Sequence, residues 1–236
     1  MIPANDRVIM ISGANRGIGL AAAQRLAASG YRLSLGARDP KVLHETFGDA
    51  EGVAVFRYDA LDLEAAEDWV QDTAQRFGRI DGLVNNAGIS RPAFTIEDAD
   101  ETVLDQMIAV NLKGPLRLIR LAMPHLIESG SGRVVNVASL SGKRVKNDNV
   151  GYAMTKFALI ALTHAVRRHG WDHGVRATAI CPSFVRTDMT AAVQAVSRDE
   201  MIQPEDLAAL IETALSLPNN AVVAEMLVNC RLEDLF

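Results

Sequence analysis

The segment SGANRGIG, residues 12–19, decides the fold that this chain can adopt. It follows a short apolar run, residues 8–11, and leads into a segment of helical periodicity that begins near Ile18. Glycines at positions 13, 17 and 19 let the backbone approach a bound anion closely, and the amino end of a helix presents unpaired N–H groups. Three glycines alone are also compatible with an ordinary tight turn. Their place between a first strand and a first helix instead favours a loop that binds a pyrophosphate.

The alternation of short apolar runs with longer helical segments continues along the chain. The predicted strands are residues 8–11, 32–36, 53–58, 82–85, 133–137, 176–180 and 225–229, and the predicted helices are residues 18–29, 41–47, 63–77, 102–128, 152–168 and 204–217. Pro115 and Pro124 are expected to bend the helix over 102–128. Such alternation is typical of βαβ units, so the sequence predicts an α/β fold: a doubly wound parallel sheet of about seven strands flanked by helices.

Length and composition agree with one globular domain. The chain has 236 residues, of which 49% are hydrophobic and 22% charged, and these are ordinary values for a globular protein. We therefore expect residues 1–236 to form a single dinucleotide-binding domain. With so many strands and crossovers in this length, cofactor and substrate are expected to share the carboxyl edge of one sheet.

The charge balance and the cysteines narrow the class of partner. A net charge of −5 is not the basic surface that nucleic acid or an anionic membrane attracts, so we expect neither. No apolar run approaches the roughly 20 residues that span a bilayer. Cys181 and Cys230 are too few for a disulfide framework, which favours a reducing cytoplasm. His169 and His173 have Gly170 between them and no third ligand nearby, so no metal site is predicted.

Three motifs in order along the chain resemble those of the short-chain dehydrogenase/reductase family. They are the glycine loop, LVNNAG over residues 83–88, and Tyr152-Ala-Met-Thr-Lys156. The resemblance is to the short, single-domain branch with an Asn-Ser-Tyr-Lys tetrad. It implies a Rossmann-like NAD(P)-binding fold and hydride transfer between nicotinamide and a carbonyl or secondary alcohol, in a homodimer or homotetramer.

Tyr152 and Lys156 are four residues apart on a predicted helix and therefore lie on one face of it. An unperturbed tyrosine has a pKa of about 10 and exchanges protons poorly at neutral pH. A neighbouring ammonium group favours the tyrosine anion, so Lys156 is expected to lower the pKa of Tyr152 and also to hold ribose hydroxyls. The structural alternative is a half-buried tyrosine with a lysine extending past it to solvent.

The family resemblance supplies the two other catalytic candidates. Ser139 in VVNVASLSG matches the serine that holds the substrate oxygen beside Tyr152, with Ser141 as its nearby competitor. Asn111 matches the residue that supports proton relay through a helix irregularity beside Lys156. An asparagine within an apolar helical stretch is unusual in itself, because its amide competes with the backbone.

Residues after the second predicted strand bear on the choice of cofactor. An acid at this place binds the adenosine ribose of NAD, but the aligned position holds Ala37 and is followed by Arg38. An arginine pairs with a 2′-phosphate, and Arg16 could supply a second cation. We therefore favour NADP(H) over NAD(H), while Asp39 leaves an NAD alternative open.

The resemblance extends to a larger set of cofactor contacts. The expected residues are Gly13, Asn15, Arg16, Gly17, Ile18, Gly19, Arg38, Asp59, Ala60, Asn86, Ala87, Gly88, Tyr152, Lys156, Pro182, Val185 and Thr187. The chain departs from the family pattern at Ser183, where glycine is usual, and in its ending EMLVNCRLEDLF. These departures put in question the backbone near the nicotinamide and the subunit contacts of the C-terminal residues.

Two segments are candidates for substrate recognition. Residues 187–201 are expected to form a lid over the substrate, by resemblance. Lys143, Arg144 and Lys146 precede Tyr152 and could hold an anionic substrate, although a solvated loop is the favoured explanation. The predicted function is that of an NADP(H)-dependent oxidoreductase acting on a small-molecule carbonyl or alcohol. The alternatives are an NAD-dependent enzyme of the same family and a non-catalytic dinucleotide-binding sensor or scaffold.

Overall fold

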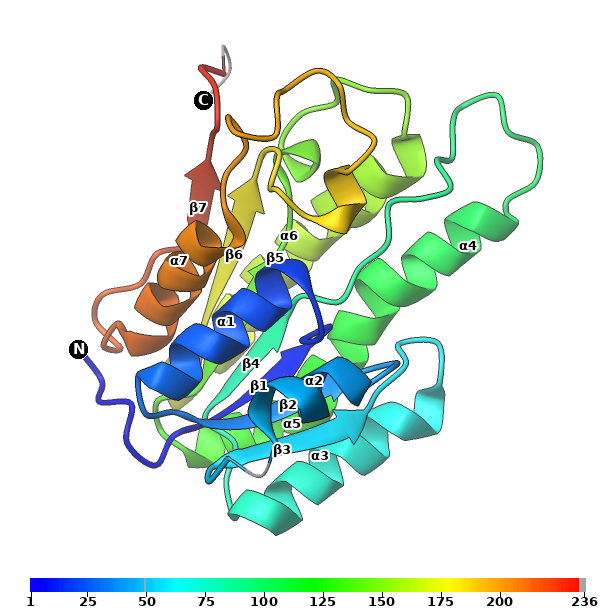
Figure 1. Ribbon diagram of the computed structural model, residues 1–236. Coiled ribbons are helices and arrows are strands. Elements are labelled where there is room, and N and C mark those ends of the chain that lie inside the picture. Colours follow the sequence, from blue (N-terminus) through cyan, green and yellow to red (C-terminus); the bar gives the residue numbers. More distant parts are fainter. Residues whose placement is uncertain (49, 234–236) are drawn as a thin grey trace.

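In the computed structural model, which describes residues 1–48 and 50–233, seven strands form one parallel sheet (Figure 1). The strands are β1 (Val8–Ser12), β2 (Arg32–Ala37), β3 (Val53–Arg57), β4 (Gly82–Asn85), β5 (Arg133–Val137), β6 (Arg176–Pro182) and β7 (Glu225–Val228). Their order across the sheet is β3-β2-β1-β4-β5-β6-β7. The order reverses between β1 and β4, which is the position where open α/β sheets bind ligands. The predicted parallel sheet is confirmed.

Helices cover both faces of the sheet, as Figure 1 shows. They are α1 (Gly17–Ala28), α2 (Lys41–Phe47), α3 (Leu63–Phe77), α4 (Thr102–Ile108), α5 (Gly114–Glu128), α6 (Val150–Gly170) and α7 (Pro204–Ser216). One buried cluster joins Ile9 and Ile11 of β1 to α1 and α7, and a second joins Met10 to Trp69 of α3 and Leu118 of α5. Successive residues of β1 thus point to opposite faces, as strand geometry requires.

The predicted helix over 102–128 is wrong in its centre. α4 ends at Ile108, a π-helical turn occupies Ala109–Lys113, and α5 begins at Gly114. Pro115 has no N–H group, so the carbonyl of Asn111 lacks its usual α-helical donor. The shifted hydrogen-bonding pattern places Asn111 at the site described below. Pro115 itself occupies the first turn of α5, where a missing N–H costs nothing.

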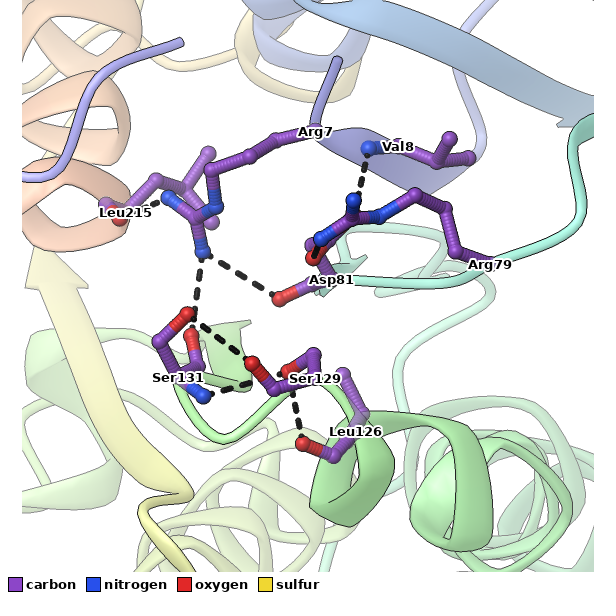
Figure 2. Close-up of polar contacts among 8 residues, drawn as sticks. All are labelled: Arg7, Val8, Arg79, Asp81, Leu126, Ser129, Ser131 and Leu215. Carbon is purple, nitrogen blue, oxygen red and sulfur yellow. Dashed lines mark hydrogen bonds and ion pairs between the residues drawn. The ribbon is translucent and has the colours of Figure 1, made fainter. Parts of the chain in front are cut away.

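Polar contacts fasten the amino end of the sheet, opposite the carboxyl edge (Figure 2). The buried Arg7 guanidinium donates hydrogen bonds to the carbonyls of Leu215 at 2.7 Å, Ser131 at 3.1 Å and Asp81 at 3.3 Å. The Asp81 carboxylate accepts from the Val8 amide at 2.9 Å and from Arg79 at 2.7 and 2.8 Å. These bonds join the start of β1 to the residue just before β4. β1 and β4 are the two strands between which the strand order reverses.

Replacing Asp81 by alanine is expected to lower the free energy of unfolding by about 2–3 kcal/mol. Its side chain is fully buried, and removal leaves the Val8 amide and the Arg79 guanidinium without their acceptor. Urea unfolding followed by circular dichroism measures the change. Asp72→Ala, which removes a carboxylate from the exposed face of α3, is the control. Equal stability of the two variants would show that the Asp81 contacts contribute nothing to the fold.

Candidate functional site

A cavity of about 430 Å³ lies at the carboxyl edge of the sheet. Most of the residues expected from the sequence line it: Gly13, Asn15, Arg16, Gly17, Ile18, Arg38, Asp59, Ala60, Asn86, Ala87, Gly88, Ser139, Tyr152, Lys156, Pro182, Val185 and Thr187. Residues from the ends of β1 through β6 therefore meet in one place, although they are far apart in sequence. Gly19 and Asn111 are the two candidates that do not line the cavity.

The glycine loop has the geometry that a phosphate group needs. Gly13 and Gly17 have φ angles of +66° and +53°, in the left-handed region that favours glycine. A Cβ atom on Gly13 would lie 2.9 Å from the Cα atom of Ala87, which the fold does not accommodate. Arg16 makes no side-chain cap at the start of α1, and the first turn of α1 contains no acidic residue. The amino end of α1 is thus suited to bind an anion, and the loop fits a dinucleotide pyrophosphate.

Gly19 acts in packing instead of lining the cavity. A Cβ atom at this position would lie 2.2 Å from the Gly13 carbonyl oxygen. The Asn86 side chain donates to that same oxygen at 2.9 Å and to the Ser12 carbonyl at 3.1 Å. Gly19 and Asn86 together hold the loop against the turn after β4.

Ser139, and not Ser141, is the serine that faces the cavity. It lies two residues after β5 ends at Val137, and its Oγ accepts a hydrogen bond from the Ser141 amide at 3.0 Å. Ser139 and Tyr152 line the same cavity.

Burial controls the protonation of Tyr152 and Lys156. It raises the pKa of Tyr152 to about 12, against a smaller opposing effect of the Ser139 hydrogen bond, and lowers the pKa of Lys156 to about 8. The Lys156 ammonium lies 5.5 Å from the centre of the Tyr152 ring and donates to the Val137 carbonyl at 2.8 Å. The expected lowering of the tyrosine pKa by Lys156 is not found, because burial dominates and Ser139 supplies the opposing effect, and Tyr152 is a protonated phenol at neutral pH.

Asn111 lies in the π-helical turn, behind the cavity wall. Its Oδ1 accepts from the Ile89 amide at 2.8 Å, and its Nδ2 donates to the Ile89 carbonyl at 2.8 Å and to Thr155 Oγ1 at 3.1 Å. A Cβ atom on Gly88 would lie 3.3 Å from Asn111 Oδ1 and 3.8 Å from Lys156 Nζ. Asn111 thus fixes the chain after β4 within a short distance of Lys156.

The end of β2 presents a cation to the cavity. Arg38 and Asp39 both line it, while Ala37 is buried. The Asp39 carboxylate accepts from the Lys41 amide at 3.0 Å, so it is already used in the turn before α2. Arg16 reaches across the mouth of the cavity to Asp188 at 3.3 Å, and both side chains are largely exposed. The side chain best placed to meet a group at the end of β2 is that of Arg38.

Asp59 serves two purposes. It lines the cavity after β3, and its Oδ1 accepts from the Leu61 amide at 3.0 Å within a turn. Asp188, Met189 and Thr190 belong to the predicted lid, and sequence reasoning missed the lining residues Tyr58, Leu61, Ile89, Gln106, Val110, Val137 and Ala138. Most of these residues lie next to a predicted site residue in the sequence, so that position could have identified them. Gln106, on α4, gave no such signal.

The three cations before Tyr152 do not line the cavity, so the expectation that they hold a substrate anion is not supported. Lys143 pairs with Glu225 of β7 at 2.8 Å, and Arg144 pairs with Glu233 at 2.7 Å. Lys146 also pairs with Glu233. Two acids, Glu225 and Glu233, thus pair with all three cations and hold them away from the cavity.

Ser183 is accommodated where the family pattern has glycine. Its amide donates to the Val228 carbonyl at 2.9 Å, which continues the pairing of β6 with β7. Its Oγ accepts from the Cys230 amide at 2.9 Å. The serine therefore connects the cavity wall to the residues after β7.

Among the described residues, 1–48 and 50–233, no helix is both long and apolar enough to cross a membrane. In the same residues, no group of three or more histidine, cysteine, aspartate or glutamate side chains is arranged to hold a metal ion.

Comparison with known proteins identifies the family. The family model for short chain dehydrogenases matches residues 7–197, and the chain belongs to this family of oxidoreductases, which bind nicotinamide dinucleotides. It is 47% identical over 229 residues to agropine synthesis reductase of Rhizobium rhizogenes, across 97% of this chain and 53% of that protein. The chain thus spans about half the length of the first curated relatives it matches.

Solved structures give the same fold. A metagenomic short-chain oxidoreductase in complex with NADP has a TM-score of 0.83 at 28% identity, over 98% of this chain and all of that one. A 3-ketoacyl-(acyl-carrier-protein) reductase from Brucella melitensis, complexed with NADH, has a TM-score of 0.88 over 96% of this chain and 98% of that one. At 24% identity the latter likeness concerns the fold alone.

Proposed function

We propose that this chain is an NADP(H)-dependent oxidoreductase that transfers hydride between nicotinamide and a carbonyl or secondary alcohol substrate. The observation that carries the proposal is a shared cavity. Ser139, Tyr152 and Lys156 line the same cavity as the glycine loop that fits a pyrophosphate. A protein that only binds a dinucleotide has no need for a serine, a phenol and a lysine together in that wall.

The roles of the residues follow from their protonation. The glycine loop and Lys156 would hold a dinucleotide whose nicotinamide would supply the hydride. Tyr152, as a neutral phenol, donates the proton that the substrate oxygen gains in reduction. Ser139 donates a hydrogen bond to the same oxygen, where negative charge develops. Lys156, cationic below a pKa of about 8, holds ribose hydroxyls. Asn111 keeps the chain at Ile89 in place beside Lys156.

The preference for NADP(H) rests on Arg38. A 2′-phosphate beside β2 would meet the Arg38 guanidinium, and the Asp39 carboxylate that would favour NAD is held in a turn by the Lys41 amide. The likeness to a short-chain oxidoreductase in complex with NADP also supports this choice.

The surroundings of the site are part of the proposal. Residues 187–201 serve as the substrate lid, supported by Thr187 through Thr190, which line the cavity. The chain acts in the cytoplasm, where Cys181 and Cys230 stay reduced. It forms a homodimer or homotetramer, consistent with the exposed apolar side chains Met154 and Phe157 on α6.

A substrate screen tests the proposal. Oxidation of NADPH and of NADH is followed by absorbance with a panel of ketones, aldehydes and 3-oxo acids. Turnover with NADPH at much higher kcat/KM than with NADH is expected. Comparable turnover with NADH supports the NAD-dependent alternative, and tight cofactor binding without turnover of any substrate supports the non-catalytic one.

The lowered pKa of Lys156 predicts a pH dependence. The group is cationic below pH about 8 and loses its charge above it, so kcat/KM for reduction is expected to fall as pH rises through about 8. A profile between pH 6 and 10 at saturating NADPH measures it. Lys156→Arg, which stays cationic, is expected to remove the fall if it retains activity. A profile flat through pH 9.5 in the unchanged protein would contradict the assignment.

A further inference from the structure

The residues after β7, 229–233, contact three loops around the cavity, and we call this segment the clasp. Its first contact is with the loop after β6. The Cys230 amide donates to Ser183 Oγ at 2.9 Å, and Ser183 lines the cavity. The clasp is thus joined to the cavity wall itself.

Its second contact is with the lid. Arg231 donates to the Ala195 carbonyl at 2.9 Å and to Glu200 Oε2 at 2.8 Å. Glu200 also accepts from Ser197 Oγ at 2.7 Å, and these hydrogen bonds lower the pKa of Glu200 to about 2. Glu200 is therefore fully ionised at neutral pH and remains a partner for Arg231.

Its third contact is with the loop between Ser139 and Tyr152. Glu233 accepts from Arg144 at 2.7 Å and from Lys146, and both bonds lower the pKa of Glu233 to about 2. Glu233 therefore holds the clasp to the loop between Ser139 and Tyr152, and Arg231 holds it to the lid.

The lid, residues 187–201, is a loop whose two ends meet. Val185 pairs with Ile202, and the Arg186 amide donates to the Ile202 carbonyl at 2.9 Å. The first half of the lid contributes Met189 and Thr190 to the cavity. Arg231 holds the second half at Ala195 and Glu200, and its two bonds therefore limit how far the first half can move from the cavity.

We propose that Arg231 is a positioning residue that sets the substrate affinity of the site by holding the lid over it. The inference rests on the proposed function. Arg231 does not line the cavity. Its bonds reach the lid at Ala195 and Glu200, whereas the cofactor contact Thr187 and the neighbouring Asp188, which pairs with Arg16, lie at the start of the lid. Its loss therefore weakens binding of the carbonyl substrate more than it weakens binding of NADPH.

Arg231→Ala is expected to raise KM for the carbonyl substrate roughly threefold to tenfold, with kcat changed less than twofold, because exposed ion pairs are individually weak. Hydrogen exchange of the Val193, Ser197 and Glu200 amides, which are hydrogen-bonded within the lid, is expected to rise by about the same factor, since these bonds break when the lid opens. Arg231→Lys, which keeps the charge and can reach one acceptor, is expected to restore part of both effects. Arg76→Ala, an exposed arginine on α3, is the control.

The exchange measurement keeps this test separate from the proposed function. If no substrate is found, faster exchange in Arg231→Ala still supports the lid contact while the proposed function fails. If turnover is found but Arg231→Ala matches Arg76→Ala in both KM and exchange, the role of Arg231 is overturned. Glu200→Gln combined with Arg231→Ala is expected to add little to either single change, because both remove the same contact.

Discussion

Tyr152→Phe is expected to lower kcat for carbonyl reduction by about a hundredfold to ten-thousandfold, the range of a lost general acid. The substrate oxygen gains a proton as hydride arrives at carbon, and the phenol of Tyr152 is the proton donor in the proposed mechanism. Phenylalanine keeps the ring and its packing but removes the hydroxyl. NADPH affinity is expected to change little, because Lys156 and the glycine loop are untouched.

Single-turnover and steady-state rates of NADPH oxidation measure the effect, with NADPH binding followed by fluorescence. Tyr31→Phe is the matched control, because it removes a buried phenol near Arg7, at the opposite end of the sheet. A Tyr152→Phe protein with more than a tenth of the normal kcat would exclude Tyr152 as the acid.

The strands and the glycine loop could be predicted because their signals are local. Residues 82–85 and 133–137 are short apolar runs, and both are strands with the predicted bounds. In the helix over 102–128, Pro115 is a local signal of a bend, but the π-helical turn at Ala109–Lys113 also depends on a contact that is not local. Asn111 contacts Ile89, which is 22 positions away.

The cations before Tyr152 show the same limit at the site. From the sequence, Arg144 and Lys146 are cations with no evident partner. In the structure both pair with Glu233, which is 89 and 87 positions away. Charge in a loop predicts a ligand only if no other segment supplies the counter-charge. By contrast, Tyr152 and Lys156 share one helix, so their common face was predictable, while the burial that sets their pKa values was not.

Arg38→Asp is expected to raise the Kd for NADPH by about a hundredfold or more and to leave the Kd for NADH equal or lower. The change removes a charge-assisted hydrogen bond to the 2′-phosphate, worth about 1.5–3 kcal/mol, and adds repulsion between two anions. For NADH the same carboxylate becomes an acceptor for ribose hydroxyls. The ratio of the two affinities therefore reverses.

Titration of each cofactor by fluorescence or calorimetry measures the reversal, at two salt concentrations to separate local contact from general electrostatics. Lys41→Asp makes the same charge change three residues further on, at a side chain that is 78% exposed and does not line the cavity. It is expected to alter NADPH affinity less than threefold. If both variants weakened NADPH binding equally, the effect would come from net charge near β2. A large effect confined to Arg38 assigns the 2′-phosphate to its guanidinium, because Arg38 lines the cavity at the end of β2 and Lys41 does not.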